Sequence, residues 1–200
     1  MKQYLAMERI RSFVAIELPD ELKQEFGRLQ ARLKAVGPLP VKWVDPYSIH
    51  LTLKFLGDVD TSRIGDIVKA IEEAARGINP FPLEVGNPGV FPSVRRTQVA
   101  WLGLQGDTDS LARLQQGIEV SLSRLGFSRE TRPFTPHLTL ARLRDRASPD
   151  ERQRFGEAFV QANITAVCLI KVDSIHLMKS QLTRNGAIYS RLGTVPLNKP

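Results

Sequence analysis

Two of the three histidines in this 200-residue chain open the same tetrapeptide, His50-Leu51-Thr52-Leu53 and His137-Leu138-Thr139-Leu140. The two copies lie 137 − 50 = 87 positions apart. Side chains two residues apart in a β-strand share a face, so each copy presents its histidine and its threonine together. The leucines between them point to the other face, toward a core. Two such strands facing one another would place two imidazoles and two hydroxyls around one small anion.

This set of groups suits phosphate chemistry. A neutral imidazole takes up a proton and a charged one releases it, and both forms exist near neutral pH because the ordinary pKa is about 6.5. One histidine could therefore activate water while the other protonates the leaving oxygen. The threonine hydroxyls could donate to non-bridging phosphate oxygens. We predict His50, His137, Thr52 and Thr139 as catalytic residues, in a scheme that has no role for a metal or a cofactor.

Three alternative interpretations of the motifs, a core role, a zinc site and a serine nucleophile, are less favoured. A single His-x-Thr in a strand is more often part of a core, but two copies in equivalent places favour catalysis. Imidazole also binds zinc, yet neither motif has a carboxylate or cysteine at ligand spacing, and threonine is a poor zinc ligand. No nucleophilic serine lies in a recognisable elbow.

The apolar spacing predicts the elements that position the motifs. In the first half it predicts strands at Arg11–Leu18, Val41–Val44 and Ile49–Leu56, a helix after Pro19-Asp20 that Gly37-Pro38 ends, and a helix from about Ile64 to Gly77. In the second half it predicts strands at Leu83–Val85, Gln98–Leu104, His137–Leu143, about 167–178 and 187–193. The last two strands would be joined by a turn through Thr183-Arg184-Asn185-Gly186. Helices are predicted over Leu111–Leu125 and after the capping box Ser148-Pro149-Asp150-Glu151.

The two halves therefore repeat one plan, in which a helix precedes the motif strand and another begins about ten residues after the histidine. We predict an α+β fold, a duplicated bilobal single domain over residues 1–200. Two antiparallel sheets would face across a central cleft, with the helices on the outside. Residues 1–8 are expected to form a loose N-terminal extension, with a functional start near Met7.

Composition narrows the class of protein. The net charge is +7, and Arg residues without Lys crowd residues 124–154 around the second motif, which favours an anionic partner bound through phosphates. No apolar stretch is long enough to span a membrane. The one cysteine, Cys168, lies in an apolar run and is expected to be a buried core residue. We expect a cytoplasmic monomer.

The motifs with their flanks, His50-Leu51-Thr52-Leu53-Lys54-Phe55-Leu56-Gly57 and Pro136 to Arg142, resemble the paired HxTx signatures of the two-histidine (2H) phosphoesterase superfamily. Within it the chain is most similar to the bacterial and archaeal RNA 2′,3′-cyclic phosphodiesterases, also called 2′-5′ RNA ligases. The segment Arg11 to Pro19 resembles the first strand of that family, and Leu177 to Tyr189 its last hairpin.

The resemblance implies hydrolysis of RNA 2′,3′-cyclic phosphate ends, or of nucleoside 2′,3′-cyclic phosphates, to 2′-phosphomonoesters. It also implies that His50 is the proton donor and His137 the proton acceptor, which the identical motifs alone do not assign. The resemblance further implies reversible 2′-5′ RNA ligation as a secondary activity. The alternatives are a basic module that binds RNA ends without turnover, and a 2H phosphodiesterase acting on another nucleotide phosphodiester.

Three further residues are candidates for substrate binding. Arg142 matches an arginine that commonly follows the second motif, but strict alternation places it on the face opposite His137, so it needs a bulge to reach the site. Lys54 has the same parity as His50 and Thr52. Phe13 could stack on a base, although it also fits a core position. His176 has no threonine two residues later and is expected to have no catalytic role.

Overall fold

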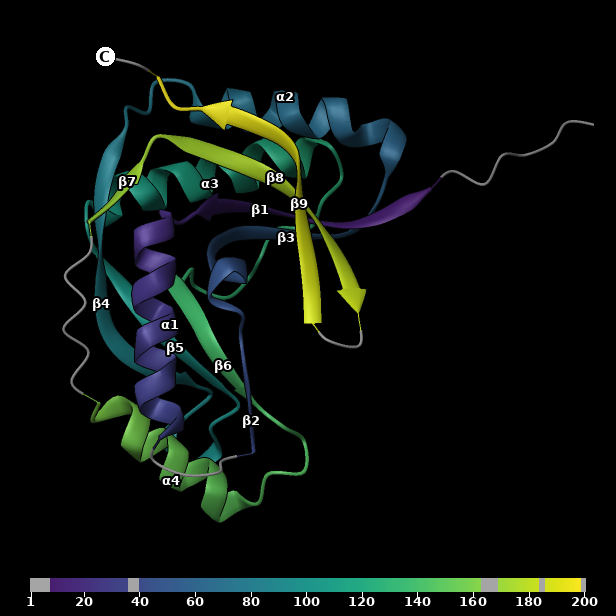
Figure 1. Cartoon of the computed structure of the whole chain (residues 1–200). Helices are drawn as coiled ribbons and strands as arrows, with labels where there is room; N and C mark the ends of the chain where they lie inside the picture. Colours follow the sequence, from purple (N-terminus) through teal and green to yellow (C-terminus); the bar gives the residue numbers. More distant parts are fainter. Residues whose placement is uncertain (1–7, 36–39, 163–168, 184–185, 199–200) are drawn as a thin grey trace, which may run out of the picture.

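Antiparallel strands form the framework of the molecule, seen in a computed structural model that describes residues 8–35, 40–162, 169–183 and 186–198 (Figure 1). The strands are β1 (Arg9–Glu17), β2 (Val41–Trp43), β3 (His50–Asp60), β4 (Phe81–Phe91), β5 (Val99–Gly106), β6 (His137–Leu143), β7 (Leu169–Val172), β8 (Ser174–Thr183) and β9 (Gly186–Pro196). The helices are α1 (Asp20–Lys34), α2 (Ile64–Ala75), α3 (Thr108–Arg124) and α4 (Pro149–Val160), with short 3₁₀ turns η1 (Pro46–Ser48), η2 (Thr61–Arg63) and η3 (Val94–Arg96).

The nine strands of the described residues belong to one sheet, and the two motif strands lie at its centre. The order is β7-β4-β5-β6-β3-β1-β8-β9, and β2 pairs with the outer part of β6. The predicted α+β class with antiparallel strands is therefore confirmed. The two expected lobes are halves of one continuous sheet, joined where β3 pairs with β6.

The duplication is visible in the order of elements around this central pair. Strand β1 lies beside β3 as β5 lies beside β6, and α2 follows β3 as α4 follows β6. The similarity between the two halves therefore extends beyond the tetrapeptide to the neighbouring strand and the following helix. An approximate two-fold relation between β3 and β6 follows, and it brings the two motifs together.

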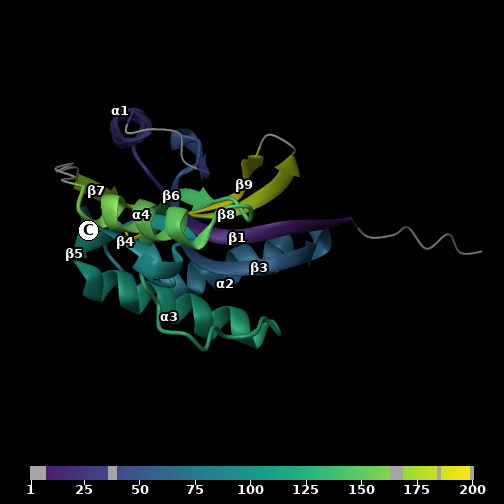
Figure 2. The ribbon, with the colours of Figure 1, turned by 90° about the horizontal axis from the view of Figure 1, so that it is seen from below.

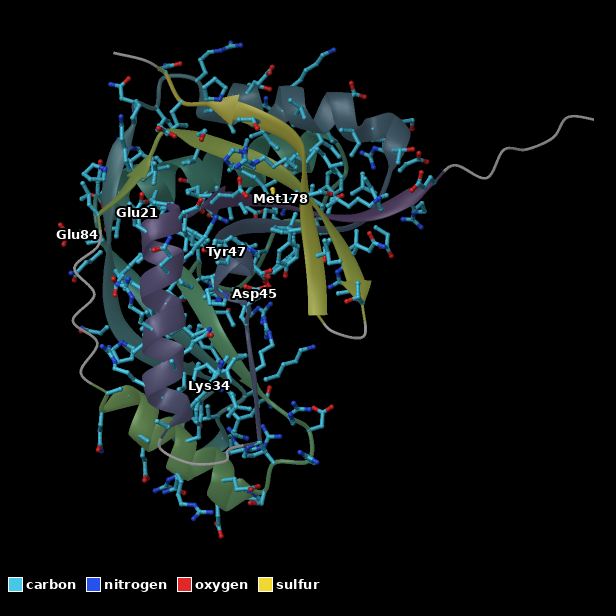
Figure 3. The ribbon with its side chains drawn as sticks, in the orientation of Figure 1. Glu21, Lys34, Asp45, Tyr47, Glu84 and Met178 are labelled. Atoms are coloured by element: carbon cyan, nitrogen blue, oxygen red, sulfur yellow. The ribbon has the colours of Figure 1, made fainter. Side chains whose placement is uncertain are left out.

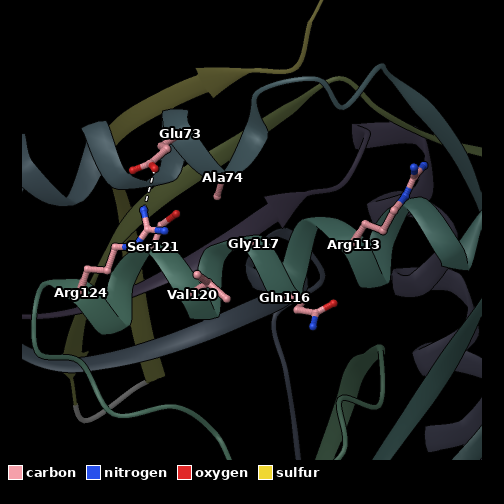
Figure 4. Close-up of a pocket in the computed structure, with 8 residues that line it drawn as sticks. All are labelled: Glu73, Ala74, Arg113, Gln116, Gly117, Val120, Ser121 and Arg124. Atoms are coloured by element: carbon pink, nitrogen blue, oxygen red, sulfur yellow. Dashed lines mark hydrogen bonds and ion pairs between the residues drawn. The ribbon is translucent and has the colours of Figure 1, made fainter.

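Helices cover the strands on both sides, as a second view shows (Figure 2). Helix α1 lies on one side, where Phe26 is fully buried and Gln30 donates to the backbone carbonyl of Leu140 on β6 at 3.3 Å. Helices α2 and α3 lie on the other side and pack closely, because Gly117 of α3 meets Ala74 of α2 (Figure 4). A Cβ atom at position 117 would lie 3.2 Å from the Ala74 carbonyl oxygen, so glycine permits this approach.

One predicted strand is wrong in its continuity. The run 167–178 is divided at Asp173 into β7, which pairs with β4, and β8, which pairs with β1 and β9. Because a single residue joins strands near opposite edges of the sheet, the sheet must curl until those edges approach one another. Apolar alternation does not encode this change of partner. Cys168, the centre of the turn at Arg184-Asn185, and all but Glu8 of the predicted N-terminal extension lie outside the described residues.

Candidate active site

The two motifs lie side by side on one face of the sheet. Leu51 pairs with Leu138 across the antiparallel strands β3 and β6, so each histidine lies across from the threonine of the other motif. Diagonal neighbours in such a pair are about 7–8 Å apart, which leaves room for a phosphate between the imidazoles. His50 and His137 are both partly exposed, whereas the leucines are buried beneath them. We call the side of the sheet that carries the four motif side chains the motif face.

Both imidazoles are held in the same way. His50 Nδ1 lies 2.8 Å from the carbonyl oxygen of Ser48, and His137 Nδ1 lies 2.7 Å from that of Thr135. A carbonyl oxygen can only accept, so each Nδ1 carries a proton and donates. In the neutral form, Nε2 of each ring is then the basic atom. The two partners, like the histidines, lie 135 − 48 = 87 positions apart, so the anchoring was duplicated with the motif.

The carbonyl that holds His50 comes from the short turn η1. Asp45 begins this turn, since its side chain accepts a hydrogen bond from the Tyr47 backbone nitrogen at 3.0 Å. Figure 3 shows both residues between α1 and the strands of the C-terminal hairpin. The cap fixes the turn, and the turn presents the Ser48 oxygen to the ring.

Aromatic side chains support the His50 ring. Phe13 stacks on it with ring centroids 4.7 Å apart, and Tyr189 meets it edge-on at 5.0 Å. Phe13 is 3% exposed and packs with Ala15 and Met178 in a small cluster separate from the main core. The expectation that Phe13 stacks on a base is therefore wrong, because its accessible surface is already covered; it positions His50.

His137 has an aromatic setting of its own. Phe91 meets its ring edge-on at 5.1 Å, and Trp101 lies 5.9 Å away. The Trp101 ring stacks on Phe91 and lies directly over Gly89, where a Cβ atom would collide with it. Glycine at position 89 thus allows the indole to lie flat on the sheet beside His137.

The pKa of His50 lies below its ordinary value of 6.5. Burial is the main cause, and the charge of His137 lowers the pKa further. The hydrogen bond to Ser48 and the carboxylate of Glu17 act in the opposite direction. His137 acts on this pKa because it lies on the adjacent strand, diagonally across from His50.

The pKa of His137 is also lowered, again chiefly by burial and then by the positive charge of Arg142, against the hydrogen bond to Thr135. A lowered pKa favours the neutral form of both rings, and a neutral ring is available to accept a proton. The charged neighbours therefore differ in sign: a carboxylate acts on His50 and a guanidinium acts on His137.

Each motif strand contains a bulge at the last residue of its tetrapeptide. In β3 the extra residue relative to β1 is Leu53, and in β6 the extra residue relative to β5 is Leu140. These positions are again 87 residues apart. A bulge with one extra residue reverses the alternation of faces beyond it. The burial pattern shows this, because two consecutive buried residues occur at that point in both strands.

The bulges bring two exposed side chains to the motif face. Arg142 lies on that face and acts electrostatically on His137 and Tyr189. Its counterpart in the other half is Phe55, which is 70% exposed and whose ring lies 6.3 Å from that of Phe13. The sequence prediction named Arg142 with the bulge as its condition, but it missed Phe55. The signal was present, because Phe55 and Arg142 both lie five residues after a motif histidine.

The same bulge removes Lys54 from the site. Lys54 is buried on the opposite face, where its Nζ pairs with Glu119 of α3 at 2.6 Å and donates to the Ser128 carbonyl at 2.8 Å. Its expected parity with His50 and Thr52 is wrong, because Leu53 is the extra residue. Lys54 ties β3 to α3 and does not face the motif residues.

The arginines around the second motif have several different partners. Arg124 pairs with Glu73 at 2.8 Å (Figure 4), and Arg132 pairs with Glu130 at 3.1 Å. Arg152 donates to four backbone carbonyls between positions 97 and 147 and so fixes the start of α4. Within this segment, Arg142 is the arginine that the structure places beside a catalytic candidate.

Two negative findings concern the described part of the chain. Among the described residues, no group of three or more His, Cys, Asp or Glu side chains could hold a metal ion. No helix in the described ranges is both long enough and apolar enough to cross a membrane.

Known proteins resemble this chain over nearly its whole length. The model of the family described as LigT-like phosphoesterase matches residues 16–101 and 102–189, so each matched stretch holds one motif. The RNA 2′,3′-cyclic phosphodiesterase of Methanothermobacter thermautotrophicus is 32% identical, covering 91% of this chain and 96% of its own. The protein of the same name from Thermotoga maritima is also 32% identical, covering 92% and 93%. The structure of Escherichia coli LigT complexed with 3′-AMP superposes with a TM-score of 0.73 at 26% identity, covering 95% of this chain and 99% of LigT.

Proposed function

The chain belongs to the LigT-like phosphoesterase family, and from that premise we propose that it hydrolyses the 2′,3′-cyclic phosphate at RNA ends to a 2′-phosphomonoester without a metal. The observation that carries the proposal is the pair of equivalently anchored imidazoles on adjacent central strands. Their placement supports general acid and general base catalysis at one phosphorus atom.

In the proposed reaction His137 is the base and His50 the acid. Neutral His137 takes a proton on Nε2 from a water molecule as the water oxygen bonds to phosphorus. The bond from phosphorus to the 3′ oxygen breaks, and protonated His50 gives its Nε2 proton to that oxygen. The product keeps the phosphate on the 2′ oxygen, and solvent returns the two histidines to their starting states.

The other side chains of the motif face hold the substrate. Thr52 and Thr139 donate to the non-bridging oxygens, whose charge changes most in the transition state. Arg142 binds a phosphate oxygen beside His137. Phe55 stacks on the terminal base, because its exposed ring lies next to the aromatic group under His50.

A turnover assay in EDTA tests this proposal. The protein is incubated with a nucleoside 2′,3′-cyclic phosphate, and the expected product is the 2′-monoester. The His50→Ala, His137→Ala double variant is the control. Turnover no greater than in that control would falsify the proposal and leave a module that only binds RNA ends. A 3′-monoester as product would reverse the assignment of the broken bond.

A substrate panel separates the related activities. It contains a 2′-5′-linked dinucleotide, a 3′-5′-linked dinucleotide, and an RNA with a cyclic end mixed with one that has a 5′ hydroxyl. Ligation is the reverse reaction, in which the 5′ hydroxyl takes part in place of water. We expect hydrolysis of the cyclic phosphate to be the fastest of these reactions; faster cleavage of a linear dinucleotide would assign the enzyme to another phosphodiester.

A further inference from the structure

The two motifs are identical, but the residues across from their histidines differ. Glu17 of β1 is the strand partner of His50, and Gly103 of β5 is the strand partner of His137. Residues directly opposite in an antiparallel pair present their side chains on the same face. A carboxylate therefore lies on the motif face next to one histidine, and the equivalent place beside the other has no side chain.

The carboxylate is held from two other strands. Glu17 Oε2 forms an ion pair with Nε of Arg191 on β9 and lies 3.5 Å from Nε2 of His176 on β8. His176 Nδ1 lies in turn 3.1 Å from the hydroxyl of Thr194. The Glu17 side chain is 25% exposed and that of His176 is 8% exposed. The Glu17 carboxylate is therefore partly buried and is held by its neighbours on β8 and β9. His176, to which the sequence assigned no role, belongs to this support.

The charged groups around His50 act on its protonated form in opposite directions. Glu17 of β1 raises the pKa of His50, and His137 of β6 lowers it. From β9, Tyr189 presents the edge of a ring whose pKa is raised by burial, so it is uncharged near neutral pH. His176 of β8 and Arg191 of β9 both lie against the Glu17 carboxylate.

We propose that Glu17 is a positioning residue that favours the protonated form of His50 relative to that of His137 and so gives two equivalent histidines opposite duties. Gly103 leaves His137 without such a partner, and Arg142 favours its neutral form. Which histidine is acid and which is base is thus decided by residues outside the duplicated tetrapeptides. The inference rests on the proposed function, because it concerns which of the two histidines carries the proton more readily at the start of that reaction.

The experiment compares Glu17→Gln with Arg191→Gln. The basic limb of the pH profile of kcat/KM reports deprotonation of the acid, and the acidic limb reports protonation of the base. Glu17→Gln removes the negative charge, so the basic limb is expected to move to lower pH by about 0.5–1 unit. Arg191→Gln leaves the carboxylate without its cation, so the basic limb is expected to move to higher pH. The acidic limb should stay in place in both variants.

Opposite shifts separate an electrostatic role from a structural one. Both substitutions break the same ion pair, so a role in stability alone would affect both variants in the same direction, and that result would overturn the inference. Glu17→Asp keeps the charge and should restore most of the wild-type profile. Glu73→Gln, which breaks the ion pair with Arg124 between α2 and α3, is the matched control and should leave both limbs unchanged.

An NMR titration gives a readout that does not depend on turnover. The chain has three histidines, so the three imidazole Cε1–H signals can be assigned with single variants. The His50 signal is expected to titrate at lower pH in Glu17→Gln, and the His137 signal to stay within about 0.2 unit of its wild-type midpoint. An unmoved His50 midpoint would overturn the inference, even in an active enzyme. Absent turnover with a shifted midpoint would overturn only the proposed function.

Discussion

Catalysis at the residue scale should be concentrated in the four motif side chains. His50→Gln and His137→Gln are each expected to lower kcat/KM by about 10²–10⁴-fold, since each removes one proton-transfer step. Thr52→Val and Thr139→Val keep the shape and remove one donor to the phosphate, for an expected loss of roughly 10–10³-fold. Steady-state rates on one cyclic phosphate measure all four, with thermal unfolding as the check on folding. Full activity of a threonine variant would contradict its role as a donor.

Phe55 is the residue whose role depends on the base of the substrate. Phe55→Ala is expected to raise KM for nucleoside 2′,3′-cyclic phosphates by about 5–150-fold, because stacking contributes roughly 1–3 kcal/mol per base. Ribose 2′,3′-cyclic phosphate has no base, so its KM should not change. The matched control is Leu182→Ala, because Leu182 is also an exposed apolar residue but lies on a different strand, β8. An equal effect on both substrates would contradict stacking.

Period-two alternation predicted the motif face correctly at the first three positions of each tetrapeptide and failed one step later. His50 and Thr52 share a face because no irregularity lies between them, whereas the extra residue Leu53 reverses the pattern at Lys54. A bulge is set by the neighbouring strand, so it cannot be read from β3 alone. At the scale of elements, one irregularity therefore explains both the loss of Lys54 from the site and the gain of Phe55.

The buried ion pair between β3 and α3 tests this account of Lys54. Lys54→Met leaves Glu119 buried without its cation, and we expect a loss of about 3–5 kcal/mol in the free energy of unfolding. The double variant Lys54→Met, Glu119→Leu should recover most of that loss, because it leaves no buried charge without a partner. Urea unfolding measures the stabilities. At a temperature where the variants stay folded, kcat/KM should match the wild type; a raised KM for Lys54→Met would return Lys54 to substrate binding.

At the scale of the whole molecule, burial of neutral histidines makes stability depend on pH. Burial lowers the pKa of His50, His137 and His176 below 6.5, so the unfolded chain binds more protons than the folded one in that range. The stabilising contribution is complete above about pH 6.5 and falls as the pH decreases through the folded pKa values. We expect a lower free energy of unfolding at pH 5.5 than at pH 7.5, measured in urea. His176→Gln should reduce this difference, and a stability that rises on acidification would contradict the directions of the three pKa shifts.

The charge of the whole chain should distinguish an RNA end from a mononucleotide. With a net charge of +7, the protein attracts every phosphate of a strand, and binding each one releases counterions. A mononucleotide offers the site a single phosphate, so its KM should rise only slightly between 50 and 200 mM salt. For an oligonucleotide with the same cyclic end, KM should rise several-fold more steeply, with a slope of about −0.7 in log affinity per phosphate contacted. Arg142→Gln, at the arginine proposed to bind the reacting phosphate, should weaken the binding of both substrates by a similar factor and leave the difference between their slopes in place. Equal salt dependence for the two substrates would mean that the protein holds the terminal nucleotide alone and that the basic surface plays no part in binding the strand.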